Sequence, residues 1–108
     1  MAFDEKLAKR IRQAVAKRKG FTEKQMFGGV AFLFSGNMCV GVHKDALIAR
    51  VDPEDTTSAL KMAHTRVFDL TGRPMKGWIL VGPAGTKGAQ LASWIARSVR
   101  FVETLPAK

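Results

Sequence analysis

Few side chains in this sequence could do covalent or metal chemistry. The histidines are His43 and His64, and the one cysteine is Cys39. Cys39 and His43 fall four residues apart on one predicted strand, which separates their Cβ atoms by roughly 13 Å. A nucleophile and its general base must lie within hydrogen-bond reach, so this pair cannot act together. No paired carboxylates or metal-ligand spacing stand out. The sequence therefore predicts a protein that is not an enzyme and uses no metal or cofactor.

The length and composition set the class of protein. The 108 residues predict a single domain, 1–108, and 46% hydrophobic with 25% charged residues is ordinary for a soluble fold. No apolar run approaches the ~20 residues of a membrane-spanning helix, so we expect no membrane partner. A lone cysteine cannot form an internal disulfide, which favours a cytoplasmic location.

Positive charge is concentrated at the N-terminus. The formal net charge is +9, and residues 1–20 hold seven basic residues against Asp4 and Glu5. A helix is predicted from Asp4 to about Lys19, with apolar residues every four positions from Phe3 to Val15. Its cationic side is either a solvated surface or a contact for phosphate. The candidate contact residues are Lys9, Arg12 and Lys17.

The stretch 26–51 predicts three consecutive antiparallel strands. Two-residue turns at Gly36-Asn37 and Lys44-Asp45 would close two hairpins, because both residue types of the first turn tolerate positive φ. Pairing Ser35 with Met38 and His43 with Ala46 gives a core face and a second face. The predicted core face carries Ala31, Leu33, Met38, Val40, Val42, Leu47, Ala49 and Val51.

The second face is unusually apolar for a surface. Val30, Phe32, Phe34 and Ile48 would form a contiguous patch there. Monomers rarely expose large apolar patches, and dimers are the commonest soluble oligomers. We therefore expect a homodimer through this face of the sheet or its edge, or a different protein bound to the patch.

The remaining elements complete an α+β fold. A helix capped by Asp52 with Pro53 at its first position is predicted to about residue 63, followed by strands at 65–70 and 78–81 and a helix at 87–103. That last helix would bury Leu91, Ile95, Ser98, Val99 and Val102, carry an aromatic ridge of Trp94 and Phe101, and turn Arg97 and Arg100 outward. The element order α-β-β-β-α-β-β-α predicts a two-layer α/β sandwich with an antiparallel sheet.

The segment from Gly72 to Gly77 is predicted to be a stiff loop. Its two glycines permit unusual backbone angles and Pro74 restricts the middle. Arg73 and Lys76 would be presented as a basic pair for an acidic protein surface or a phosphate. The alternative is a structural crossover in which Met75 fills the core.

Three linked motifs resemble those of the TfoX N-terminal domain family, which forms the first half of Sxy-type competence regulators. The matching residues are Met26, Phe27, Gly28 and Gly29, then Gly36 and Asn37, then Gly72, Pro74 and Gly77. The resemblance implies a secretion-chaperone-like two-layer fold and a regulatory context, with the motif residues in structural roles. The family's two-domain regulators carry a second, helical domain that these 108 residues do not contain, so a role in switching on DNA-uptake genes is not carried over.

These observations predict a non-enzymatic regulatory or adaptor domain that acts through protein–protein contacts. The alternative is a nucleic-acid-binding module that uses the basic N-terminal helix and the Arg73/Lys76 loop. Nucleic acid is less favoured because the basic helix lacks the interleaved aromatic residues on which bases stack.

Overall fold

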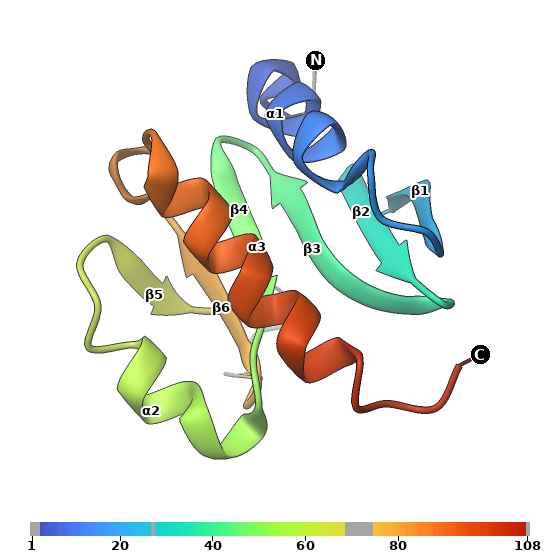
Figure 1. The fold of residues 1–108 in the computed structure, drawn as a ribbon. Coiled ribbons are helices and arrows are strands. Elements are labelled where there is room, and N and C mark those ends of the chain that lie inside the picture. The colour runs from blue at the N-terminus through green and yellow to red at the C-terminus, as the bar shows by residue number, and fades with distance from the viewer. Residues whose placement is uncertain (1–2, 27, 69–74, 108) are drawn as a thin grey trace.

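The computed structural model describes residues 3–26, 28–68 and 75–107, which form one antiparallel sheet with helices packed on it (Figure 1). The sheet has six strands in the order β1-β2-β3-β4-β6-β5. Their bounds are β1 Phe21–Met26, β2 Gly29–Phe34, β3 Asn37–His43, β4 Ala46–Arg50, β5 Thr65–Val67 and β6 Trp78–Val81. The helices are α1 Glu5–Val15, α2 Thr56–Ala59 and α3 Ala89–Val102, with short 3-10 turns η1 Pro53–Asp55 and η2 Pro83–Gly85. The predicted α+β class with an antiparallel sheet is therefore confirmed.

Strand β1 is the element that the sequence prediction missed. The predicted order has three strands before the second helix, and the structure has four. The residues FTEKQM are mostly polar, so they give no apolar alternation. They form a strand because β1 is the sheet edge and pairs along its whole length with β2, from Phe21 opposite Phe34 to Met26 opposite Gly29. Gly28 lies in the turn between β1 and β2 and has φ +72°.

Helices α1 and α3 cover the same face of the sheet (Figure 1). Asp4 caps α1, because its carboxylate accepts hydrogen bonds from the amides of Lys6 and Leu7 at 2.9 and 3.1 Å. The helix ends at Val15, one turn earlier than predicted. The predicted buried stripe of α3 is confirmed: Leu91, Ile95, Ser98, Val99 and Val102 are all buried. Trp94 is buried with them, whereas Phe101 is half-buried.

The turn of the first hairpin lies one residue earlier than the predicted Gly36-Asn37 turn. The turn residues are Ser35 and Gly36, with φ +50° and +85°, so Asn37 belongs to β3 and pairs with Phe34. The side chain of Asn37 is buried instead, and its amide donates a 2.8 Å hydrogen bond to the carbonyl of Pro106. The second predicted turn is confirmed, since His43 pairs with Ala46.

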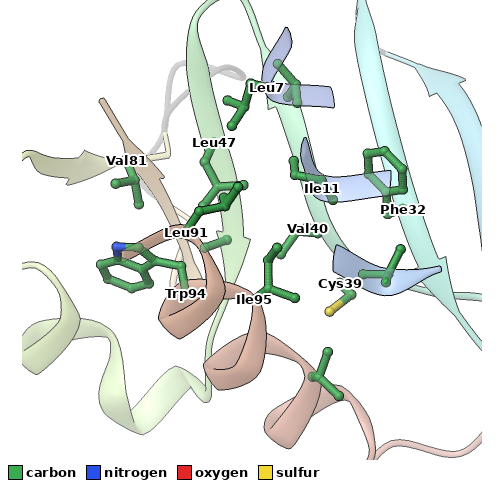
Figure 2. Close-up of a cluster of buried hydrophobic side chains, with 14 of the residues drawn as sticks. Leu7, Ile11, Phe32, Cys39, Val40, Leu47, Val81, Leu91, Trp94 and Ile95 are labelled. Carbon is green, nitrogen blue, oxygen red and sulfur yellow. The ribbon is translucent and has the colours of Figure 1, made fainter. Parts of the chain in front are cut away.

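A β-bulge between β2 and β3 also changes the pairing of the two strands from the predicted one. Leu33 pairs with Met38 but Phe32 pairs with Val40, so Cys39 is the extra residue on β3. A one-residue slip turns every side chain of a strand to the opposite face. Val30 and Phe32 therefore lie in the core under the helices, together with Cys39, as Figure 2 shows for Phe32 and Cys39. The predicted faces of β2 were wrong, and Met38 was wrongly placed on the core face of β3. Val40, Val42, Leu47, Ala49 and Val51 are core residues as predicted.

The opposite face of the sheet has its own small apolar cluster. It contains Ala46, Ile48, Phe68 and Leu80, with Met38 and Trp78 packed against it. Ala46, Ile48, Phe68 and Leu80 are each no more than 6% exposed. The face that the sequence predicted to be an open apolar surface is thus largely buried within the chain itself.

Candidate functional site

The side chains that the sequence singled out for possible chemistry can now be placed in the fold. Cys39 is completely buried in the core, and this burial raises the pKa of its thiol to about 12. A thiol with such a pKa stays protonated at neutral pH, and the thiolate is the nucleophilic form. Within the described ranges, no three His, Cys, Asp or Glu side chains cluster as metal ligands would.

The predicted apolar contact patch is wrong. Val30 and Phe32 are each 2% exposed and lie on the helix-covered face. Phe34 is half-buried against Phe21, with 5.3 Å between ring centroids. Ile48 lies in the cluster on the opposite face. These four predicted residues therefore do not share a surface, and the physical reason is the shifted turn and the bulge.

The predicted basic contact residues Lys9, Arg12 and Lys17 divide into two groups, and Lys17 lies in the turn after α1. The guanidinium of Arg12 makes a bidentate ion pair with Glu23 of β1, at 2.8 Å from Nε to Oε1 and 2.7 Å from Nη2 to Oε2. This hydrogen bonding lowers the pKa of Glu23. Lys9 and Lys17 are exposed. The guanidinium of Arg12 thus connects α1 to the edge strand β1, and its hydrogen bonds to Glu23 compete with any bound phosphate.

In the second basic segment, Lys76 is exposed and Arg73 lies outside the described residues. Met75, which the alternative interpretation placed in the core, is 36% exposed. Gly77 has φ +88°, and its amide donates a 2.7 Å hydrogen bond to the hydroxyl of Thr56. This end of the loop is therefore attached to the start of α2.

A hollow in the described surface lies along one flank of α3. One part has a volume of about 640 Å³ and is bounded by Asp52 and Asp55 of the η1 segment and by Arg97, Arg100 and Phe101 of α3. A second part of about 370 Å³ shares Ser93 and Arg97 with the first, and it adds Met62, Ala63, Gly85, Gln90 and Trp94. We call the combined feature the α2–α3 groove. It follows α3 from Gln90 to Phe101, a distance of about 17 Å at the rise of an α-helix, and continues to Thr104 in the turn after the helix.

The groove exists because two neighbouring helices differ in length. Helix α2 has four residues, whereas α3 has 14. Asp52 fixes the start of the shorter segment by accepting a 2.9 Å hydrogen bond from the amide of Glu54. The side chains of α3 that face the groove include the small Ser93 and Ala96. A long helix with small outward residues beside a one-turn helix leaves part of its flank uncovered.

Arg97 lies between the two parts of the groove. Its Nη1 donates to the thioether of Met62 at 3.2 Å, and its Nη2 donates to the hydroxyl of Ser58 at 3.4 Å. Its guanidinium also lies over the ring of Trp94, 5.5 Å from the centroid. The sequence predicted that Arg97 would point away from the protein, and instead it reaches across to the α2 segment.

A second arginine is held between aromatic rings near the C-terminal end of α3. The guanidinium of Arg50 is 4.9 Å from the ring centroid of Trp78 and 5.7 Å from that of Phe101. Partial burial lowers the pKa of Arg50. Phe101 thus both lines the groove and contacts the cation of Arg50, and of the aromatic ridge predicted on α3 only Trp94 is fully buried.

Sequence reasoning missed the groove as a site. Asp52 was interpreted as a helix cap, and Arg97 and Arg100 as side chains that turn outward. A signal was nevertheless present, because Trp94, Arg97, Arg100 and Phe101 recur at spacings of three and four that place them along one flank of a helix.

The comparison with family models decides which family this is. The model of the TfoX N-terminal domain matches residues 13–102, which is most of the chain. The chain belongs to the TfoX N-terminal domain family. No curated protein and no solved structure is significantly similar to it. Among the described motif residues of this TfoX N-terminal domain, Gly28, Gly36 and Gly77 have positive φ. The side-chain amide of Asn37 donates a hydrogen bond to the carbonyl of Pro106. Phe27, Gly72 and Pro74 lie outside the described residues.

Proposed function

We propose that this TfoX N-terminal domain is a non-enzymatic regulatory or adaptor module that binds a partner protein in the α2–α3 groove. Membership of the family supports a regulatory role. We propose that the domain acts in the cytoplasm, in the regulation of transcription or competence. The observation that carries the proposal is the groove itself, which combines an exposed thioether, an aromatic edge and charged side chains along most of α3.

The composition of the groove suits a protein segment. Met62 is 46% exposed at one end, and unbranched, polarisable methionine side chains adapt to varied apolar partners. Trp94 and Phe101 also line the groove, and aromatic side chains, methionine and arginine are enriched at the centres of protein interfaces.

In the described part of the chain no helix is long and apolar enough to cross a membrane.

A capture experiment with two matched variants tests this function. Ala96 lines the groove, whereas Ala92 is exposed on the same helix but outside the groove lining. We expect Ala96→Trp to fill the groove and abolish partner capture from lysate, while Ala92→Trp retains it. The capture is repeated after nuclease treatment, and the captured protein is then purified and titrated directly. Equal capture by both variants, or capture that needs intact nucleic acid, would contradict the proposal.

Nucleic-acid binding through α1 and the turn that follows it remains the second candidate function, and the exposed Lys9 and Lys17 are the observation in its favour. Arg12 contributes less to it because Glu23 neutralises its charge. A mobility-shift assay with duplex DNA at ~0.15 M salt separates the candidates. Retardation of the wild type that is lost in Lys9→Glu/Lys17→Glu would favour nucleic acid.

Homodimerisation stays a prediction, although the apolar patch that motivated it is buried. Pairing of two β1 edges is disfavoured by symmetry, because a twofold antiparallel pairing places one residue opposite its own copy. At the centre of β1 that residue is Glu23 or Lys24, and like charges directly opposite are destabilising. Sedimentation at high protein concentration tests the oligomeric state.

A further inference from the structure

We infer that the segment bound in the α2–α3 groove is acidic and that one of its carboxylates pairs with Arg97. This inference rests on the proposed function and specifies the chemistry of the partner. It is carried by the juxtaposition of Arg97 with Met62, Ser58 and Trp94 in the middle of the groove.

The present hydrogen-bond acceptors of Arg97 are poor ones. A thioether sulfur is a weak acceptor, and the hydroxyl of Ser58 lies at 3.4 Å, beyond the usual range for an N–H···O bond. A carboxylate is the best match for a guanidinium, since it accepts two parallel charge-assisted hydrogen bonds. A partner that supplied one would replace two weak interactions with a strong pair.

Arg97 is also arranged in advance for such a pairing. Its guanidinium is fixed over the face of Trp94, which is itself 4% exposed and anchored in the core. Arginine loses less freedom on binding when its planar group is already held. The two contacts to the α2 segment direct Nη1 and Nη2 toward Met62 and Ser58, which lie beside the groove.

The acidic residues of the groove do not neutralise Arg97. Asp52 and Asp55 line the same hollow, yet the one ion pair within 4.0 Å among the described residues joins Arg12 and Glu23. Arg100 adds a second exposed cation on α3. The formal net charge of +9 further attracts an acidic partner over long range.

Asp52 and Asp55 also distinguish a protein segment from a nucleic acid. A phosphate backbone carries a negative charge at every unit, so it would meet these two carboxylates as well as the arginines. A peptide can place a carboxylate beside Arg97, an apolar side chain on Met62, and a neutral or basic side chain opposite Asp52. The groove therefore fits a short segment with an uneven charge distribution.

The test uses random peptides displayed on phage, long enough to span the groove and selected on the whole domain. We expect the selected peptides to be enriched in Asp and Glu and to shift the backbone NMR signals of α2 and α3. Arg97→Gln should weaken binding of the synthesised peptides by about 10-fold or more. Arg97→Lys should also weaken it, because lysine keeps the charge but loses the planar fork.

The matched control is Lys9→Gln, which removes one exposed positive charge far from the groove on α1. We expect it to change affinity by less than about twofold at ~0.15 M salt. Equal losses in Lys9→Gln and Arg97→Gln would show attraction to the net charge alone and overturn the inference. Selected peptides without acidic residues that still shift the groove signals would overturn the inference but leave the proposed function standing. Failure to select any peptide for the groove would count against both.

Discussion

The hydroxyl of Thr56 accepts a 2.7 Å hydrogen bond from the amide of Gly77 and donates a 2.8 Å hydrogen bond to the carbonyl of Pro53. One buried side chain thereby joins the turn before β6 to the first turn of the α2 segment. The carbonyl of Gly77 in turn accepts a 2.8 Å hydrogen bond from the amide of Val51, directly after β4. These contacts fix the wall of the groove to the sheet.

We expect Thr56→Val to lower the free energy of unfolding by about 1–3 kcal/mol, because the buried amide of Gly77 would lose its acceptor. Thr56→Ser keeps the hydroxyl and serves as the control. Urea denaturation of the three proteins measures the difference. If the valine and serine variants were equally stable, the hydrogen bond to Gly77 would not contribute to stability.

The adjacent glycines Gly28 and Gly29 should respond differently to alanine. A Cβ on Gly29 would lie 2.0 Å from the carbonyl oxygen of Val42, so the β2–β3 ladder would have to open. We expect a loss of more than about 3 kcal/mol or failure to fold. At Gly28 nothing lies within 4 Å of an added Cβ, and the cost is only the positive φ, about 1–2 kcal/mol. Thermal unfolding of both variants decides the order, and a reversed order would show that the pairing of β2 with β3 is different.

The thiol of Cys39 should be unreactive in the folded protein. Its pKa of about 12 leaves almost no thiolate at pH 8, so labelling by a disulfide reagent should proceed only as fast as the chain unfolds. The folded pKa is raised above the unfolded value of about 8.5, so the unfolded state loses its proton first. The thiol's contribution to stability is therefore complete below about pH 8 and declines as the pH rises toward 12.

Comparison of the wild type with Cys39→Ala isolates the contribution of the thiol to stability at alkaline pH. The lysines also titrate in this range, but they do so in both proteins, so their effect cancels. The wild type should lose stability more steeply above pH 9, by up to about 1.4 kcal/mol per pH unit from this one group. Rapid labelling of the native protein at pH 8 would contradict the burial of Cys39.

The ion pair between Arg12 and Glu23 should stabilise the fold only slightly. Both side chains are partly exposed, 54% for Arg12 and 37% for Glu23, so Arg12→Gln should cost less than about 1 kcal/mol at neutral pH. The pKa of Glu23 is lowered in the folded state, so this contribution is present above its unfolded pKa and is lost as the pH falls through the folded value. An NMR titration should show the pKa of Glu23 rising in Arg12→Gln and unchanged in Lys9→Gln. If the pKa of Glu23 were the same in Arg12→Gln as in the wild type, Arg12 and Glu23 would not form an ion pair in solution.

Local sequence signals were sufficient where a side chain or turn determines structure by itself. The cap at Asp4, the turn at Lys44, strand β6 and the buried stripe of α3 are examples. Prediction failed where the outcome depends on distant parts of the chain. Strand β1 has little apolar pattern and is ordered by pairing with β2, and Asn37 is turned inward by Pro106, 69 residues away. The groove likewise depends on the relative lengths of two helices, which no short window of sequence contains.

The bulge at Cys39 has a consequence for how the chain folds. Both faces of β2 are apolar, and Gly36-Asn37 is as acceptable a turn chemically as Ser35-Gly36. An isolated β2–β3 hairpin therefore has two competing alignments, one of which presents Ala31 and Leu33 to the helices in place of Val30 and Phe32. The contacts that separate them, Asn37 to Pro106 and Phe32 under α1, form only when the two ends of the chain dock. We therefore expect the native alignment to be selected by these contacts between distant parts of the chain, and not by the hairpin alone.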